Sequence, residues 1–182
     1  MDSYEVIRNI HKIGHLISGK VISYEIFEDD ISRHADIELK TNSEFKSTIR
    51  ILPLENDEQI PKVGSTINAV IVGHGYDTLY LSLDKKDFEN VEDSKLFYQI
   101  IEELEENQII EGTVLQVRPF GIFVDLSLPF LGLIDIGHTS FNKGECLPRD
   151  FNEKFKEGDK IKCIISYFRF HNRQIGLGYL SS

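Results

Sequence analysis

The sequence predicts a mostly β protein in which two small five-stranded barrels are joined by an α-helix, with a short helix at the N-terminus. In two parts of the chain, short runs rich in β-branched residues alternate with Gly, Asn and Asp, a pattern typical of strands and turns. A helical segment separates these parts, and the second part repeats the pattern of the first. We therefore expect an acidic domain at 1–87, a helical linker at 88–107 and a second domain at 108–182.

The N-terminal helix is expected within residues 2–17, where apolar residues recur every three to four positions. The strands of the first domain follow from alternating polar and apolar residues. They are expected at 19–27, 35–40, 45–54, 64–72 and 78–83.

The linker is expected to form a helix over about 93–106, with one apolar face and an acidic run at 102–106 on the other. Two roles are open for it: a rigid connection, or a cover for one of the barrels. The apolar face consists of Leu96, Phe97, Ile100, Ile101 and Leu104.

The second domain is expected to hold five short strands over 112–126, 131–136, 158–168 and 173–180. This number of strands in so short a segment fits a small Greek-key barrel such as the OB fold. Residues 62–84 resemble residues 156–180, which indicates an internal duplication. The first strands also match, because Gly19, Val21, Tyr24 and Phe27 have the spacing of Gly112, Val114, Val117 and Phe120.

The charge is uneven along the chain. The net charge is −10, with 22 acidic and 11 basic residues in 1–106 but 8 acidic and 9 basic residues in 107–182. Phosphate attraction dominates nucleic-acid affinity. The first part is therefore a poor nucleic-acid binder on charge alone, whereas the second part is not excluded.

The location is expected to be cytoplasmic. The sequence has no apolar run long enough to span a membrane and no N-terminal secretion signal. The first of these observations also predicts no membrane association. Cys146 and Cys163 form no CxxC or Cys/His cluster, so we expect two reduced thiols, with a disulfide between them as the alternative.

Several motifs in about 108–180 resemble the S1 domain, the RNA-binding OB-fold module named after ribosomal protein S1. Residues 17–87 resemble it only in outline. The motifs are Gly112, Val114, Val117, Phe120, Gly121, Phe123 and Val124 in the opening pattern, then Leu131–Asp135, Phe155–Ile161 and Ile175–Gly178.

The resemblance implies that Phe120 and Phe123 are exposed on the sheet and stack bases. In the family, a His at the position of Asp135 and an acidic and a basic residue around the last turn complete the site. Here Asp135 replaces the His, and Arg169 and Arg173 are close enough to that turn to supply positive charge.

Each of these residues also has a purely structural interpretation. Phe120 and Phe123 form either a base-stacking platform or part of the core, because Pro119 and Gly121 disturb the alternation that would decide between them. Arg118, Arg169 and Arg173 are either phosphate contacts or ordinary solvated surface.

The first domain lacks the platform at the matching positions. Phe27 is kept, but Glu28 stands where Gly121 does and Asp30 stands where Phe123 does. The run of Glu28, Asp29 and Asp30 would repel phosphate. We therefore expect a structural or protein-binding role for this domain.

No catalytic motif is recognisable, and we expect a protein without enzymatic activity, cofactor or metal. His11 and His15 have the i, i+4 spacing of helical metal ligands, but the sequence suggests no third ligand for them.

Two functions compete. The first is a non-catalytic RNA-binding protein whose second barrel stacks single-stranded RNA, with weak and salt-sensitive affinity and a role near the ribosome or in transcript handling. The second is an acidic module that docks to a basic protein, such as a nuclease or another nucleic-acid-binding protein, as an immunity or inhibitor protein does. Glu28, Asp29 and Asp30 are the expected contacts in that case.

Overall fold

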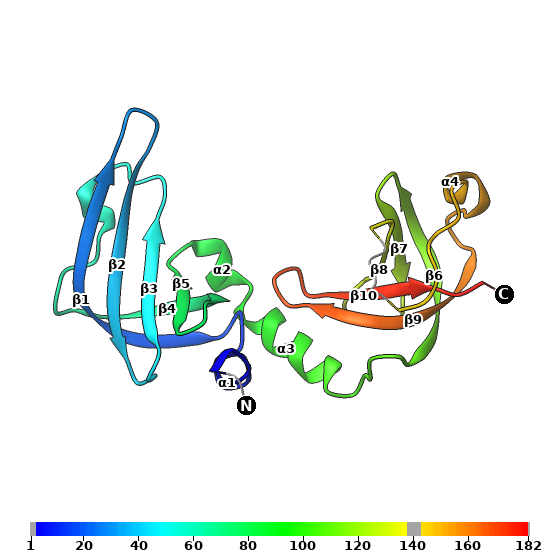
Figure 1. The fold of residues 1–182 in the computed structure, drawn as a ribbon, viewed down its shortest axis with the longest axis horizontal. Coiled ribbons are helices and arrows are strands. Elements are labelled where there is room, and N and C mark those ends of the chain that lie inside the picture. Colours follow the sequence, from blue (N-terminus) through cyan, green and yellow to red (C-terminus); the bar gives the residue numbers. More distant parts are fainter. Residues whose placement is uncertain (1–2, 138–142, 182) are drawn as a thin grey trace. The chain divides into compact units, whose positions relative to one another are not determined.

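The computed structural model describes residues 3–137 and 143–181. It divides into two compact units, Met1–Lys95 and Leu96–Ser182, and each contains a closed five-stranded barrel (Figure 1). The expected mostly β fold class is confirmed. Within the described residues, no helix is long and apolar enough to cross a membrane.

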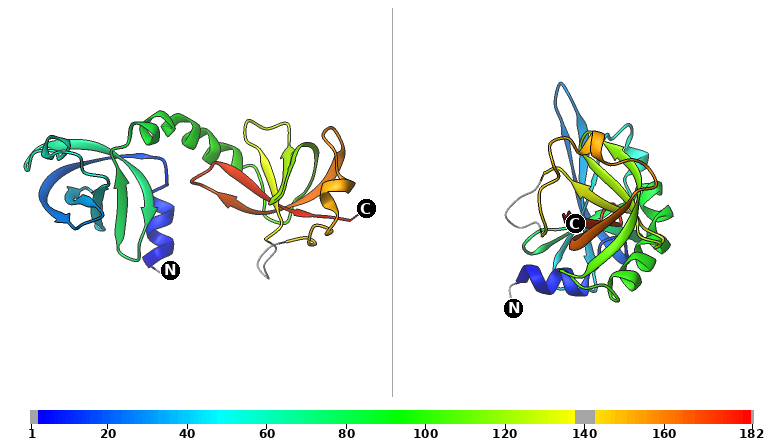
Figure 2. Two further views of the ribbon diagram at one scale, coloured as in Figure 1. Left: turned by 90° about the horizontal axis from the view of Figure 1, so that it is seen from above. Right: turned by 90° about the vertical axis from the view of Figure 1, so that its right-hand side faces the viewer.

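The first barrel consists of β1 to β5, with strand order β1-β2-β3-β5-β4. Strand β4 pairs with β1 and closes the barrel, and β3 pairs with β5 in parallel. Helix α1 lies beside β4 (Figure 2). The elements are α1 (Ser3–Ile10), β1 (Leu16–Glu28), β2 (Arg33–Thr41), β3 (Lys46–Ile51), the 3-10 turn η1 (Asp57–Gln59), β4 (Thr66–His74) and β5 (Thr78–Ser82).

The second barrel has the same strand order and the same parallel pair. Its five strands are ordered β6-β7-β8-β10-β9, β8 pairs with β10 in parallel, and β9 closes onto β6. Helix α2 (Lys85–Glu89) belongs to the first unit and lies beside β4, and α3 (Val91–Ile101) runs from the first unit into the second. The other elements of the second unit are β6 (Ile109–Arg118), β7 (Gly121–Asp125), β8 (Gly132–Asp135), α4 (Phe151–Lys154), β9 (Lys160–Arg169) and β10 (Gln174–Tyr179).

A buried residue from a helix completes each core. Ile7 of α1 belongs to the core of the first barrel, and Phe97 of α3 belongs to the core of the second. Phe97 is fully buried, and its ring forms an edge-to-face pair with Phe130 at a centroid distance of 5.1 Å. Of the two roles left open for the helix, the part around Phe97 therefore acts as a cover for the second barrel. The expected bounds of about 93–106 were wrong at the C-terminal end, because the helix ends at Ile101 and the acidic run 102–106 lies beyond it.

The first strand of each barrel carries a β-bulge at the same position. The register shifts between Val21 and Ser23 in β1, and between Val114 and Gln116 in β6. A bulge bends its strand and sharpens its twist, which helps a short sheet to close.

The strand register corrects the alignment of the two barrels around these bulges. Ser23 lies opposite Glu38, and the equivalent Gln116 lies opposite Phe123. The first-barrel counterpart of Phe123 is therefore Glu38, and the expectation that it is Asp30 was wrong.

The same register makes Asp36 the counterpart of Gly121, so the assignment of Glu28 to that position was also wrong. Asp36 lies opposite Glu25, as Gly121 lies opposite Arg118. The cause is hairpin length, because β1 continues to Glu28 whereas the equivalent strand β6 turns directly after Arg118.

Candidate nucleic-acid interface

A tight turn of Pro119 and Phe120 joins β6 to β7 and is followed by Gly121 at φ 153°. A Cβ at this position would lie 2.2 Å from the carbonyl oxygen of Ile134. Only glycine lets β7 approach β8 this closely. Gly121 is therefore a structural requirement of the second barrel, and it fixes where Phe120 leaves the sheet.

Phe120 and Phe123 lie together beside this turn. Phe120 is 49% exposed and Phe123 is partly exposed. Their ring centroids are 5.9 Å apart at an interplanar angle of 89°, an edge-to-face pair. Neither ring belongs to the buried core of the second barrel.

The strand register extends this aromatic pair across the sheet. Leu133 lies opposite Phe123, Gly176 lies beside Leu133, and Tyr167 lies opposite Gly176. Residues paired in this way project from the same side of a sheet. Leu133 is buried without belonging to the core cluster, which agrees with a position on the outer side beneath these rings.

Tyr167 closes the row, and its ring lies over Gly176, where a Cβ would come within 2.5 Å of the ring atoms. We call the surface formed by Phe120, Phe123, Leu133 and Tyr167 the aromatic face. It presents π surfaces of the kind on which unpaired bases stack.

Arg169 is fixed at the aromatic face by three hydrogen bonds, the longest of which runs from its Nη1 to Gln174 Oε1 at 3.4 Å. Its Nη2 donates to Asp135 Oδ2 at 3.0 Å and to the Tyr167 hydroxyl at 2.6 Å. The guanidinium carbon lies 5.2 Å from the centroid of the Tyr167 ring. Asp135 is itself oriented, because the Gly137 N–H donates to its Oδ1 at 2.7 Å.

The pKa of Arg169 reflects this setting. Burial lowers it, but the hydrogen bonds to Asp135 and Tyr167 and the charge of Asp135 outweigh burial, so the net pKa is raised. Arg169 thus remains cationic at any working pH, and Asp135 offsets part of its charge.

The other two arginines that the sequence put forward as phosphate contacts lie in or next to turns. Arg118 is exposed and lies opposite Gly121 at the end of β6. Arg173 lies in the turn between β9 and β10 at φ 49°. Sequence reasoning missed Tyr167, although its position two residues before Arg169 in a strand predicts a shared side of the sheet.

The acidic run of the first barrel has mostly local roles. Glu28 pairs with Arg33 at 3.2 Å. Asp29 Oδ1 accepts hydrogen bonds from the Ile31 and Ser32 N–H groups at 2.8 and 2.7 Å, which stabilises the turn and lowers the pKa of Asp29. Asp30 is exposed.

No metal site is evident in the described part of the chain, where no group of three or more His, Cys, Asp or Glu side chains is placed to hold an ion. The side chains of the aromatic face themselves offer stacking, hydrogen bonding and charge attraction.

Solved structures with a similar fold include GSP13 from Bacillus subtilis, at 22% identity and a TM-score of 0.35 over 42% of this chain and 55% of that protein. RNase R of Mycoplasma genitalium, in complex with ribose-methylated single-stranded RNA, matches at 21% identity and a TM-score of 0.39 over 52% of this chain and 16% of RNase R. A multidomain protein with nucleic acid binding domains from Streptococcus pneumoniae matches at 19% identity and a TM-score of 0.29 over 91% of this chain and 51% of that protein.

The chain thus spans only about half of the length of GSP13. No curated protein matches the chain. Residues 103–177, which contain the aromatic face, match the S1 RNA binding domain family, so the resemblance predicted from the sequence is confirmed for the second barrel.

Proposed function

We propose that the protein is a non-catalytic RNA-binding protein whose second barrel stacks single-stranded RNA on the aromatic face. The observation that carries this proposal is the exposed edge-to-face pair of Phe120 and Phe123, within a segment that matches an RNA binding domain. Single-stranded RNA is the natural ligand, because its unstacked bases are accessible to aromatic side chains.

Phe120 is the principal stacking residue in this proposal. Its ring is the more exposed of the pair and is held in an edge-to-face contact with Phe123. Each base stacked on an aromatic ring contributes ~1–3 kcal/mol. Tyr167 adds a further ring on the same side of the sheet.

Arg118 and Arg169 are the proposed phosphate contacts. Two neutralised phosphates predict a slope of about −1.4 for log K against log salt concentration on a single strand. Affinity is therefore weak and falls with salt, in keeping with the near balance of acidic and basic residues in 107–182. We further expect the RNA to be ribosome-associated and the setting to be cytoplasmic.

The test is fluorescence anisotropy of a labelled mixed-sequence single-stranded RNA with the full chain, at about 50 and 200 mM salt, a range over which phosphate attraction changes strongly. Phe120→Leu keeps apolar bulk but removes the π surface, and we expect it to weaken binding by about 5- to 160-fold. Phe120→Tyr keeps the ring and is the matched control, with affinity close to that of the native protein.

Two results would contradict the proposal. One is no binding at the lower salt concentration. The other is equal loss of affinity in the leucine and tyrosine variants, which would show that the ring itself does not bind the base.

A further inference from the structure

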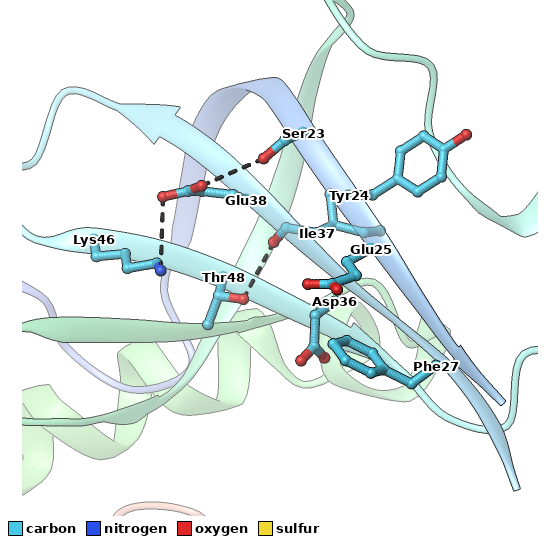
Figure 3. Close-up of a pocket in the computed structure, with 9 residues that line it drawn as sticks. All are labelled: Ser23, Tyr24, Glu25, Phe27, Asp36, Ile37, Glu38, Lys46 and Thr48. Atoms are coloured by element: carbon cyan, nitrogen blue, oxygen red, sulfur yellow. Dashed lines mark hydrogen bonds and ion pairs between the residues drawn. The ribbon is translucent and has the colours of Figure 1, made fainter. Parts of the chain in front are cut away.

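The outer side of the first barrel carries a groove of about 460 Å³ over β1, β2 and β3. By the strand register of the two barrels, it occupies the place that the aromatic face occupies on the second barrel. Figure 3 shows its side chains. They are Ser23, Tyr24, Glu25, Phe27, Asp36, Ile37, Glu38, Lys46 and Thr48.

Two carboxylates stand here at positions that are uncharged in the second barrel. Glu38 stands at the position of Phe123, and Asp36 stands at the position of Gly121. The groove is lined by three carboxylates and one ammonium group, and Arg50 beside Asp36 adds a second cation, so one negative charge remains in excess. The aromatic face has the opposite excess, with Arg118 and Arg169 against Asp135.

Two of the three carboxylates have cationic neighbours. Asp36 accepts two hydrogen bonds from Arg50, both at 2.7 Å. Glu38 accepts from the Ser23 hydroxyl at 3.3 Å and lies 3.8 Å from Lys46 Nζ, a loose ion pair.

Glu25 differs from both of these carboxylates. It is exposed, it lies opposite Asp36, and no cation of the described residues forms an ion pair with it. A carboxylate in this position attracts a cationic ligand and repels phosphate.

An aromatic ring borders the carboxylate of Glu25. Phe27 is 40% exposed, and the ring of His34 stacks on it at 4.9 Å and 15°. In Figure 3, Phe27, Glu25 and Asp36 lie at one end of the groove, and Ser23, Glu38 and Lys46 lie at the other. A ring held in place beside carboxylates suits a guanidinium, which stacks on one and forms hydrogen bonds with the other.

We propose that this groove, rather than the acidic run at Glu28–Asp30, docks an extended arginine-bearing segment of a basic protein partner. Charge complementarity selects the occupant. An arginine side chain lies against Phe27 and donates to Glu25, while further cations of the segment approach Glu38. The first barrel then recruits a protein, and the second barrel is free to bind RNA.

The test uses a synthetic nine-residue peptide of alternating arginine and serine, titrated into the full chain labelled with nitrogen-15. We expect amide shifts clustered at Tyr24, Glu25, Phe27 and Asp36. A peptide with citrulline in place of arginine keeps the shape but not the charge, and it should produce no such shifts.

The variant Glu25→Gln should weaken peptide binding about two- to fivefold, the range typical of an exposed ion pair. Asp30→Asn makes the same change of charge at the hairpin tip and is the matched control, with unchanged affinity expected. Both side chains are exposed, so neither substitution disturbs the core.

Three results would overturn the docking proposal: equal effects of Glu25→Gln and Asp30→Asn, peptide shifts that map to the second barrel, or shifts in the groove caused by single-stranded RNA instead of the peptide. Phe120→Leu should leave peptide binding unchanged, so a failure of RNA binding and a failure of peptide docking are distinguishable.

Discussion

Gly121→Ala is expected to destabilise the second barrel strongly. The alanine Cβ would lie 2.2 Å from the carbonyl oxygen of Ile134, whereas real Cβ contacts stay above 3.0 Å, so the two strands must separate by at least the difference of 0.8 Å. The backbone at φ 153° adds strain of about 1–3 kcal/mol. Breaking the ladder between β7 and β8 leaves unpaired groups that cost about 1–3 kcal/mol. The free energy of unfolding should therefore fall by about 2–6 kcal/mol.

Gly158→Ala is the matched control in the same barrel. Gly158 also has a positive φ, of 92°, but no atom lies within 4 Å of the point that an alanine Cβ would occupy, so only a conformational cost of about 1–2 kcal/mol applies.

The assay is hydrogen exchange followed by mass spectrometry, which reports the free energy of opening segment by segment. Peptides that cover β7 and β8 should lose protection in Gly121→Ala far more than in Gly158→Ala. Equal loss in the two variants would refute the steric account of this glycine.

Three further predictions concern charge and thiol chemistry. Asp135→Asn should tighten RNA binding several-fold at low salt, because it removes a carboxylate and frees the guanidinium of Arg169; weaker binding in an anisotropy titration would show that Asp135 instead orients the arginine productively. In the folded protein the pKa of His11 is lowered from its ordinary value of 6.5, mainly by burial. The unfolded chain therefore binds more protons than the folded chain as the pH falls through this range, and the first barrel should lose stability between pH 7 and pH 5. His11→Gln should reduce this loss in urea titrations at the two pH values, and an unchanged pH dependence would contradict it. Burial raises the pKa of Cys163 to about 12, whereas Cys146 is exposed, so a disulfide thiol reagent should modify one thiol quickly and the second only on unfolding; two fast thiols would disprove this.

The two barrels and their strands were predictable from the sequence, because alternation and turn residues are local signals. The linker was predicted less well, since α2 was missed and the helix expected over about 93–106 ends at Ile101. The Gly-x-Val openings at Gly19 and Gly112 align the first strand of one barrel with the first strand of the other. The pairing beyond the bulge was not predictable, since hairpin length depends on where the chain turns. The turn at Asp29 comes five residues after Tyr24, whereas the second barrel turns at Pro119, only two residues after the equivalent Val117.

That shift in the turn is why the acidic groove was missed. Glu25, Asp36 and Glu38 meet only through strand pairing, and an alignment without gaps pointed to Glu28 and Asp30 instead. In the second barrel the turn is short, so Phe120 and Phe123 keep the spacing that the sequence motif expects. These two candidate residues could therefore be identified directly from the sequence.

The contact between Arg169 and Asp135 also lay beyond sequence reasoning, although both residues were candidates. They are 34 positions apart and come from different strands. A replacement for the family's His was visible in the sequence, but its ion pair with an arginine depends on how β8 and β9 are brought together by β10.

The central claim is that RNA bases stack on the aromatic face of the second barrel. The most direct measurement is the carbon-13 aromatic NMR spectrum of phenylalanine-labelled full-length protein during titration with single-stranded RNA. Base stacking should shift the ring signals of Phe120 and Phe123 and leave the signal of Phe27 in the first barrel unchanged. Unmoved signals of Phe120 and Phe123 at saturating RNA, or a shift confined to Phe27, would contradict the account.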